Sequence, residues 1–278
     1  MTDELLTKRD RLLAILREMG RVLVAFSGGV DSAVVAQAAY IALGENATAI
    51  TADSPSVARR ELADAQRIAE QIAIQHRIIA TDEFANADYA RNDGSRCYYC
   101  KDELYGRIFA LADAVVVSGA NVDDAGDFRP GLTAAAEHGV RHPLQEAGLK
   151  KNEVRELARH WGLDVWDKPA SPCLSSRIAP GVAATPERTA RIEAAETVLH
   201  QMGLRECRVR LHEGELARIE VPLDEVAEIA GARETINKKL KELGFRYVTL
   251  DLGGFRSGSL NELVTLETRR KFVKEVVS

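Results

Sequence analysis

Cysteine is scarce in this chain, with four residues among 278. So few cysteines cannot build the disulfide framework of a small secreted domain. They are expected to be thiols, metal ligands or packing residues in a reducing compartment. The four are Cys97, Cys100, Cys173 and Cys207.

Long apolar runs are also missing. No stretch approaches the roughly 18–20 apolar residues that a helix needs to cross a bilayer. Residues 1–20 carry charges throughout and lack the apolar centre and cleavage site of a signal peptide. We therefore expect a cytoplasmic protein.

The chain has no excess of positive charge, because its formal net charge at pH 7 is -5. This balance argues against a polyanion as the main partner, although a local basic site remains compatible with it. Internal repeats and low-complexity tracts are absent from the sequence, and its length suits one large domain or two unequal ones.

Strand and helix patterns alternate along the first part of the chain. This order is typical of βαβ units and predicts an α/β fold, with a parallel sheet covered by helices on both faces. The expected strands are residues 21–26, 47–53, 76–81, 113–121 and a short one around Val165; the expected helices are residues 5–16, 31–44, 59–73 and 151–162.

The pattern changes after residues 166–186, a connector rich in proline, serine and glycine. A smaller α+β domain is expected beyond it, with helices at 187–203 and 223–244, a hairpin at 207–221 and a strand at 247–254. We predict two domains, residues 1–178 and 179–278.

The stretch "SGGVDS", residues 27–32, follows the first expected strand and opens the next helix. Its glycines let the backbone approach a ligand, and successive amides at a helix N-terminus form an anion site. The alternative is an ordinary strand–helix turn with Asp31 or Ser32 as the N-cap. The stretch matches neither GxxxxGK[ST] nor GxGxxG.

SGGxDS resembles the PP-loop of the N-type ATP pyrophosphatases, which have an adenine nucleotide alpha hydrolase-like fold, adenylate their substrates and release pyrophosphate. The carboxylate of Asp31 can hold the Mg²⁺ that accompanies a nucleotide. By analogy with this family, the end of the second strand, Thr51, Ala52 and Asp53, is expected to contact the adenosine. The same analogy places Gly119 near the nucleotide, across the point where the strand order reverses. The implied ATP-binding residues are Ser27, Gly28, Gly29, Asp31, Ser32, Ala52 and Gly119.

Three cysteines lie in two further motifs, Cys97 and Cys100 in "RCYYCK" and Cys173 in "SPCLSSR". A CxxC pair binds zinc, exchanges disulfides or holds an iron–sulfur cluster. The sequence offers no HxxxH and no second CxxC for zinc, and no thioredoxin-like context. Three cysteines would leave one iron of a four-iron cluster open to an exogenous sulfide. The alternative is a set of incidental thiols, and Cys207 is interpreted as a packing residue.

Six segments together resemble the LarE family of ATP-dependent sulfur transferases: "AFSGGVDS", "DSPSVARREL", "RCYYCKDELY", "SGANVDDAGDFRPG", "SPCLSSRI" and "LDLGGFRSGSLNE". They extend from about residue 20 to about residue 265. The resemblance implies that the protein adenylates a carboxylate of pyridinium-3,5-biscarboxylate mononucleotide and converts it to a thiocarboxylate for a nickel-pincer cofactor.

The resemblance implies two alternative sulfur sources. Some members of the family sacrifice the sulfur of the cysteine that corresponds to Cys173. Others hold a [4Fe-4S] cluster on three cysteines and transfer a cluster-bound sulfide. Because Cys97 and Cys100 accompany Cys173, we favour the cluster. The implied cofactors are ATP, Mg²⁺ and this cluster, and the sulfide donor is not identified.

Arginines in the matching segments suit a substrate with phosphate and carboxylate groups, because a guanidinium binds such groups through two parallel hydrogen bonds. Arg208, Arg210 and Arg256 are the predicted substrate-binding residues. Residues predicted to act in catalysis are Cys173, Asp31, Ser176, Arg177 and Glu196. Glu193 shares a helix face with Glu196, and ordinary surface placement is the alternative for both. The loop with Asp123, Asp124, Asp127 and Arg129 matches the family without an assigned role.

Two other functions compete with this interpretation. A PP-loop tRNA thiolase would need a basic RNA-binding surface, which the net charge does not favour. A nucleotide-binding or cluster-carrying regulator would need the loop but not a second polar site. From the resemblance we also expect a homo-oligomer, with the C-terminal domain as its contact region.

Overall fold

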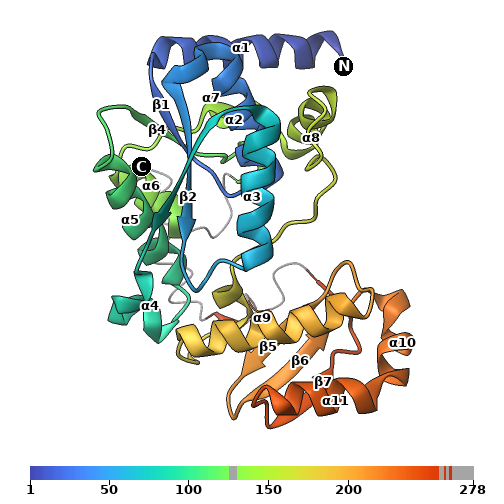
Figure 1. Cartoon of the computed structure of the whole chain (residues 1–278). Coiled ribbons are helices and arrows are strands. Elements are labelled where there is room, and N and C mark those ends of the chain that lie inside the picture. Colours follow the sequence, from blue (N-terminus) through green and yellow to red (C-terminus); the bar gives the residue numbers. More distant parts are fainter. Residues whose placement is uncertain (125–129, 257–259, 261–262, 265–278) are drawn as a thin grey trace. The chain divides into compact units, whose positions relative to one another are not determined.

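The computed structural model describes residues 1–124, 130–256, 260 and 263–264. Asp127, Arg129 and part of the last LarE-like segment lie outside the described residues. The chain forms two compact units (Figure 1). The first contains Met1–Glu83 and Cys97–Ser171, and the second contains Phe84–Arg96 and the described residues from Pro172 onward. The domain division at residues 178 and 179 stays a prediction.

A parallel sheet forms the centre of the first unit. Its strands lie in the order β3-β2-β1-β4, and every neighbouring pair is parallel. The strands are β1 (Val22–Ala25), β2 (Ala47–Asp53), β3 (Gln75–Ala80) and β4 (Val115–Val117). β2 and β3 lie on one side of β1, and β4 lies on the other side. The direction in which the chain adds strands therefore reverses between β1 and β4. Ligands of such sheets bind outside the carboxyl ends of the strands at this point.

Helices cover both faces of this sheet. Neighbouring residues of a strand point to opposite faces, and here both sets are apolar and need to be buried. Val22 and Val24 belong to one apolar core with α1, α2, α3 and α8, whereas Leu23 belongs to a second core with α5 and α6. The expected α/β class is confirmed. The helices are α1 (Asp3–Met19), α2 (Val30–Leu43), α3 (Arg59–Ile72), α5 (Arg96–Phe109), α6 (Pro130–Glu137), α7 (Pro143–Glu146) and α8 (Lys151–His160).

The strand expected around Val165 is wrong. Val165 is buried in the first core but lies in a turn, where the amide of Trp166 donates to the carbonyl of Leu163 and that of Lys168 to the carbonyl of Val165. The short apolar pattern therefore reflects packing under a turn, with backbone bonds made locally rather than to a neighbouring strand.

The second unit contains a three-stranded sheet in the order β5-β6-β7, with β5 and β6 antiparallel and β6 and β7 parallel. Apolar residues of α9 and α11, such as Ile192, Leu199 and Leu240, are buried in this unit, as are Val209 and Ile219 of the sheet. The expected α+β class is confirmed. The elements are α4 (Ala87–Arg91), η4 (Leu174–Arg177), α9 (Pro186–Gln201), β5 (Arg208–His212), β6 (Leu216–Glu220), α10 (Val226–Gly231), α11 (Arg233–Glu242) and β7 (Tyr247–Leu250).

No helix in the described part of the chain is both long enough and apolar enough to cross a membrane.

Candidate functional site

The loop between β1 and α2 is built around Gly28. Its φ of +69° lies in the left-handed region, and a Cβ there would come within 2.7 Å of the Cα of Ala65 in α3. Glycine alone satisfies both conditions, because it has no Cβ. The second glycine, Gly29, is the N-cap of α2 and makes no side-chain capping bond.

Two serine hydroxyls order the same loop. The amide of Ser27 donates to Oγ of Ser32 (3.2 Å), and that hydroxyl donates to the carbonyl of Gly29 (3.0 Å). The hydroxyl of Ser27 accepts from the amide of Gly29 (3.3 Å). Neither Asp31 nor Ser32 is the N-cap of α2, so the ordinary capped turn is not what forms. The first-turn amides of a helix have no intrahelical acceptor, and with the helix dipole they attract an anion.

The end of β4 contacts the start of α2. A Cβ at Gly119 would lie 2.7 Å from the amide nitrogen of Ser32 and 2.9 Å from the carbonyl carbon of Asp31. The order of the strands and this contact place Gly119 beside the loop, at the point where the sheet order reverses. A side chain at this position would displace the first turn of α2.

Asp31 has a cationic partner. It forms an ion pair with the amine of Lys151, and its second oxygen accepts a bond from the side-chain amide of Asn121 at 3.3 Å. Lys151 is also fixed by its backbone, since its amide donates to Asp123 at 2.7 Å. The loop at Asp123 thus holds the first residue of α8 next to residues 27–32, which we call the phosphate-type loop. One carboxylate and one ammonium group are placed there.

The carboxyl end of β2 is held by polar side chains. The hydroxyl of Thr51 donates to the carbonyl of Phe26 (2.8 Å), and Nε2 of His76 lies 2.8 Å from the same hydroxyl. Because that hydroxyl already donates its proton, Nε2 of His76 acts as the donor. Burial lowers the pKa of His76 and favours the neutral ring. Ala52, the next residue of β2, is half-buried.

Cys97 and Cys100 lie in the first two turns of α5. Residues three apart share a helix face, and the structure gives Cys97 as exposed and Cys100 as half-buried. Two thiols on one accessible face fit a pair of metal or cluster ligands. Within the described residues, no group of three or more His, Cys, Asp or Glu side chains is arranged to hold a metal ion.

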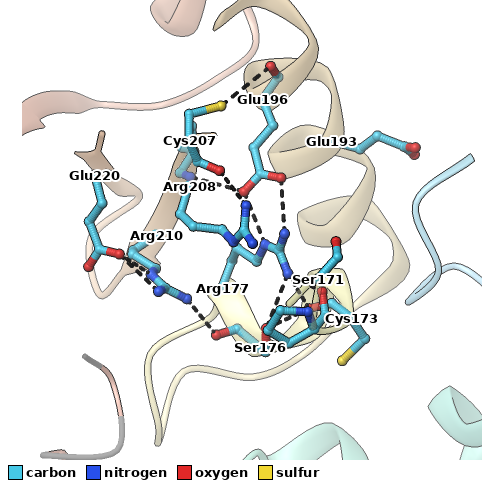
Figure 2. A network of polar contacts seen from close by, with 12 residues as sticks. Ser171, Cys173, Ser176, Arg177, Glu193, Glu196, Cys207, Arg208, Arg210 and Glu220 are labelled. Carbon is cyan, nitrogen blue, oxygen red and sulfur yellow. Dashed lines mark hydrogen bonds and ion pairs between the residues drawn. The ribbon is translucent and has the colours of Figure 1, made fainter. Parts of the chain in front are cut away.

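In the second unit, Arg177 links the segment around Cys173 to α9 (Figure 2). It is 1% exposed, and its Nε and Nη2 donate to the two carboxylate oxygens of Glu196 at 3.0 and 3.3 Å. Its Nη1 donates to the carbonyls of Pro172 and Cys173. The hydroxyl of Ser176 donates to the same carbonyl of Cys173 at 2.6 Å. The backbone at Cys173 is therefore fixed by Arg177 and Ser176, and Glu196 in turn holds Arg177.

Arg208 and Arg210 extend this network along β5. Arg210 pairs with the fully buried Glu220 at 2.8 Å and donates to the carbonyl of Ser176 at 3.2 Å. Arg208 donates to the carbonyl of Cys207 at 2.7 Å and stacks over the ring of Phe255. Burial, followed by the neighbouring charge of Arg177, lowers the pKa of Arg208.

Comparisons with known proteins show which sequences the chain is similar to. Residues 14–108 match the family model described as NAD synthase. The chain is 45% identical to an uncharacterised protein of Synechocystis sp., over 93% of this chain and 98% of that protein. It is 40% identical to the pyridinium-3,5-bisthiocarboxylic acid mononucleotide synthase of Lactiplantibacillus plantarum, over 94% and 96% of the two chains. The chain belongs to the LarE family.

More distant similarity links this LarE relative to the tRNA-specific 2-thiouridylase MnmA of Parvibaculum lavamentivorans. The two are 27% identical over 54% of this chain and 48% of the other. Family membership makes the chain an enzyme of the ATP-using PP-loop class.

The other predicted residues differ in their exposure. Arg256 is exposed and lies 3.8 Å from Asp251, which pairs with Arg218, and Arg218 in turn pairs with Glu220. Glu193 points away from Arg177 (Figure 2). Glu196 is buried, so the alternative of an ordinary surface position does not hold for it. Cys207 is fully buried, in agreement with a packing residue.

Sequence reasoning missed Lys151 and Glu220. Lys151 opens α8, where the helix dipole disfavours a positive charge, and this placement is itself a signal that something else holds it. Glu220 shares a face of β6 with Arg218, opposite Arg208 and Arg210 of β5. The alternation of charged residues on both strands would have predicted that their side chains meet.

Proposed function

We propose that the chain is an ATP-dependent sulfur transferase that converts a carboxylate of pyridinium-3,5-biscarboxylate mononucleotide into a thiocarboxylate, for a nickel-pincer cofactor. The observation that carries this proposal is the match along 94% of the chain to a protein named for the bisthiocarboxylic acid mononucleotide. The uncapped start of α2 beside Gly119 supports the use of ATP.

The first step activates the substrate. A carboxylate oxygen attacks the α-phosphorus of ATP, the bond from that phosphorus to the bridging oxygen of the β-phosphate breaks, and pyrophosphate leaves. Ser27, Gly28, Gly29 and Ser32 would bind the departing pyrophosphate through amides and hydroxyls. Asp31 would bind Mg²⁺, and this ion would replace the amine of Lys151 as the partner of the Asp31 carboxylate.

The second step transfers sulfur. A sulfur nucleophile attacks the acyl carbon, the carbon–oxygen bond to AMP breaks, and AMP departs with the electron pair. If Cys173 supplies the sulfur, a thioester forms. Loss of its Cα proton then breaks the Cβ–S bond, which leaves dehydroalanine in the protein and a thiocarboxylate on the product.

We favour a [4Fe-4S] cluster held by Cys97, Cys100 and Cys173 over the sacrifice of Cys173. The accessible face shared by Cys97 and Cys100 supports this choice, since a sacrificial mechanism has no use for the pair. When bound, such a cluster would supply a sulfide and so allow repeated turnover.

The second unit would bind the anionic substrate through Arg208 and Arg210, with Arg256 as a further contact. Among the described residues, the guanidinium groups of Arg177, Arg208 and Arg210 are buried close together in this unit. Guanidinium groups are suited to bind a phosphate or carboxylate, which supports this assignment. Ser176, Arg177 and Glu196 would hold Cys173 in place during transfer.

Mass spectrometry after one turnover tests the proposal. Anaerobically purified protein is mixed with ATP, Mg²⁺ and the biscarboxylate mononucleotide. Thiolated product with unchanged protein mass supports the cluster, whereas protein lighter by one H₂S at Cys173 supports sacrifice. Absence of both product and substrate-dependent pyrophosphate would contradict the proposed function.

Iron and acid-labile sulfide analysis tests the ligands separately. Cys97→Ala is expected to lose the cluster, and Cys207→Ala, the matched control in a buried packing position, is expected to keep it. Retention of a full complement of iron in the Cys97 variant would exclude this ligand set.

A PP-loop tRNA thiolase is the second candidate, favoured only by the partial similarity to MnmA. We further propose that the enzyme acts in the cytoplasm as a homo-oligomer through its second unit. Light scattering on the purified chain, and on a variant with Leu252→Asp at an exposed apolar position of that unit, tests the oligomer.

A further inference from the structure

The segment that leads to Cys173 is fastened to one face of α3. Lys168 pairs with Glu61 at 2.8 Å and with Asp64 at 2.6 Å, and the hydroxyl of Ser171 donates to Glu61 at 3.0 Å. Lys168 is 20% exposed and Glu61 is 16% exposed. An ion pair with this degree of burial is screened less by solvent than a surface pair.

Further contacts fix the earlier part of the segment to α3. The carbonyl of Gly162 accepts from Gln71 at 2.9 Å, and Asp164 pairs with Arg67 at 2.9 Å. The α3 residues that bind the segment are Glu61, Asp64, Arg67 and Gln71. Their spacing of three, three and four residues places them on one face of the helix.

Arg155 of α8 holds the backbone of the same segment. Its guanidinium donates to the carbonyl of Trp166 at 2.7 Å and to that of Lys168 at 2.8 Å. Residues 162–171 are thus bound by two helices of the first unit before the chain passes into the second unit at Pro172.

The sequence "KPASPC", residues 168–173, limits the freedom of the chain beyond these anchors. Each proline fixes its own φ, and the residue before a proline is restricted to extended conformations. Only two peptide links separate Ser171 from Cys173, so their Cα atoms cannot be more than ~7 Å apart. The anchors at Lys168 and Ser171 therefore limit where Cys173 can lie.

The anchor point is close to the phosphate-type loop along α3. Glu61 lies one helical turn before Ala65, and Ala65 is the residue that a Cβ at Gly28 would meet at 2.7 Å. The chain that carries the sulfur ligand leaves the first unit from this part of α3.

We propose that Lys168, held by Glu61 and Asp64, is a positioning residue for Cys173. It fixes the point from which the Cys173 segment leaves the nucleotide-binding unit. The inference rests on the proposed function, and it applies whether Cys173 ligates a cluster or gives up its own sulfur. In this role Lys168 acts through Cys173 and is not a catalytic residue.

Lys8 provides a matched control. It is 21% exposed and pairs with Glu153 and Glu4 at 2.7 and 3.0 Å, so Lys8→Met removes a similar pair of contacts from the same unit. Lys168→Met and Lys8→Met are expected to have similar melting temperatures. Lys168→Arg keeps the charge and serves as the rescue variant.

Two measurements test the proposal. In hydrogen exchange, amides of residues 162–171 are expected to exchange ~10-fold faster in Lys168→Met than in wild type, and to stay unchanged in Lys8→Met. In single-turnover kinetics, Lys168→Met is expected to release pyrophosphate within about twofold of the wild-type rate but to form thiolated product ~10-fold more slowly, because misplacing a reacting group is costly. Lys168→Arg should restore most of that rate.

The outcomes separate the two proposals. Wild-type protein that yields neither pyrophosphate nor product contradicts the proposed function. In that case the exchange experiment still tests whether Lys168 orders residues 162–171. Unchanged exchange in Lys168→Met overturns the positioning role. So does product formation at the rate of Lys8→Met, even if exchange is faster.

Discussion

At the scale of single residues, Gly28 has the most restrictive position in the phosphate-type loop. Its positive φ and the 2.7 Å approach to Ala65 exclude any side chain. The motif SGGxDS therefore reflects a backbone requirement as well as a chemical one. This is why a short sequence pattern is enough to identify the loop.

Gly28→Ala is expected to lose stability and to weaken ATP binding by about tenfold or more, which corresponds to ~1.4 kcal/mol. Gly20→Ala is the control, because Gly20 has a φ of +71° but a Cβ there would meet nothing within 4 Å. Both variants should lose ~1–2 kcal/mol from the left-handed backbone. Urea unfolding and ATP titration separate the effects, and equal ATP affinities in the two variants would contradict the role of the close approach.

His76 predicts a pH dependence of stability. Burial lowers its pKa from 6.5 in the folded chain. Below pH 6.5 the unfolded chain therefore binds a proton that the folded chain does not, so stability falls as the pH decreases from 6.5 toward the folded pKa. His76→Gln, whose amide can still donate to Thr51, should reduce this slope. Urea midpoints between about pH 5.5 and 7.5 measure it, and an unchanged slope would exclude His76 as its source.

At the scale of elements, the ion pair of Arg177 and Glu196 joins η4 to α9. Its side chains are 2% and 6% exposed, so loss of one partner leaves a buried charge. Glu196 also accepts from the amide of Val209 in β5 at 3.1 Å. One carboxylate thus connects a helix, a strand and the segment that carries Cys173.

Glu196→Gln is expected to cost ~3–5 kcal/mol of unfolding free energy, the usual penalty for breaking a buried pair. Arg107→Met, which removes a helix-surface pair with Glu103 that is 49% and 30% exposed, should cost about 0.3–0.5 kcal/mol. Urea denaturation of both variants tests the contrast. Similar losses would mean that the buried pair contributes no more than a surface one.

Prediction of the elements depended on how local their signals are. Strands β1 and β2 and helix α2 follow from apolar runs and their boundaries, which are properties of neighbouring residues. The prediction of a strand around Val165 failed for this reason. A short apolar run does not reveal whether its backbone hydrogen bonds go to a neighbouring strand or form a local turn. For Arg210, the sequence indicated a position in a strand but not the partner Glu220. The turn after β5 and the antiparallel strand β6 bring Glu220 close to Arg210.

At the scale of the whole molecule, the net charge of -5 separates the two enzyme candidates. Nucleic-acid binding depends mainly on contacts between basic residues and phosphates and weakens steeply with salt. We expect no saturable binding of bulk tRNA at physiological salt. Filter binding measures this, with a salt series as the control, and binding with micromolar affinity or better would favour the tRNA thiolase.

The sequence by itself determined the α/β class, the phosphate-type loop and the family, because each depends on residues close together in the chain or on motifs kept in order. Tertiary structure alone decided which charges meet. Lys151 reaches Asp31 across 120 residues, Lys168 reaches Asp64 across 104, and Arg177 reaches Glu196 across 19. The physical reason is that an ion pair needs a separation of a few ångströms, and packing of the helices and strands sets that distance, whatever the spacing in the sequence.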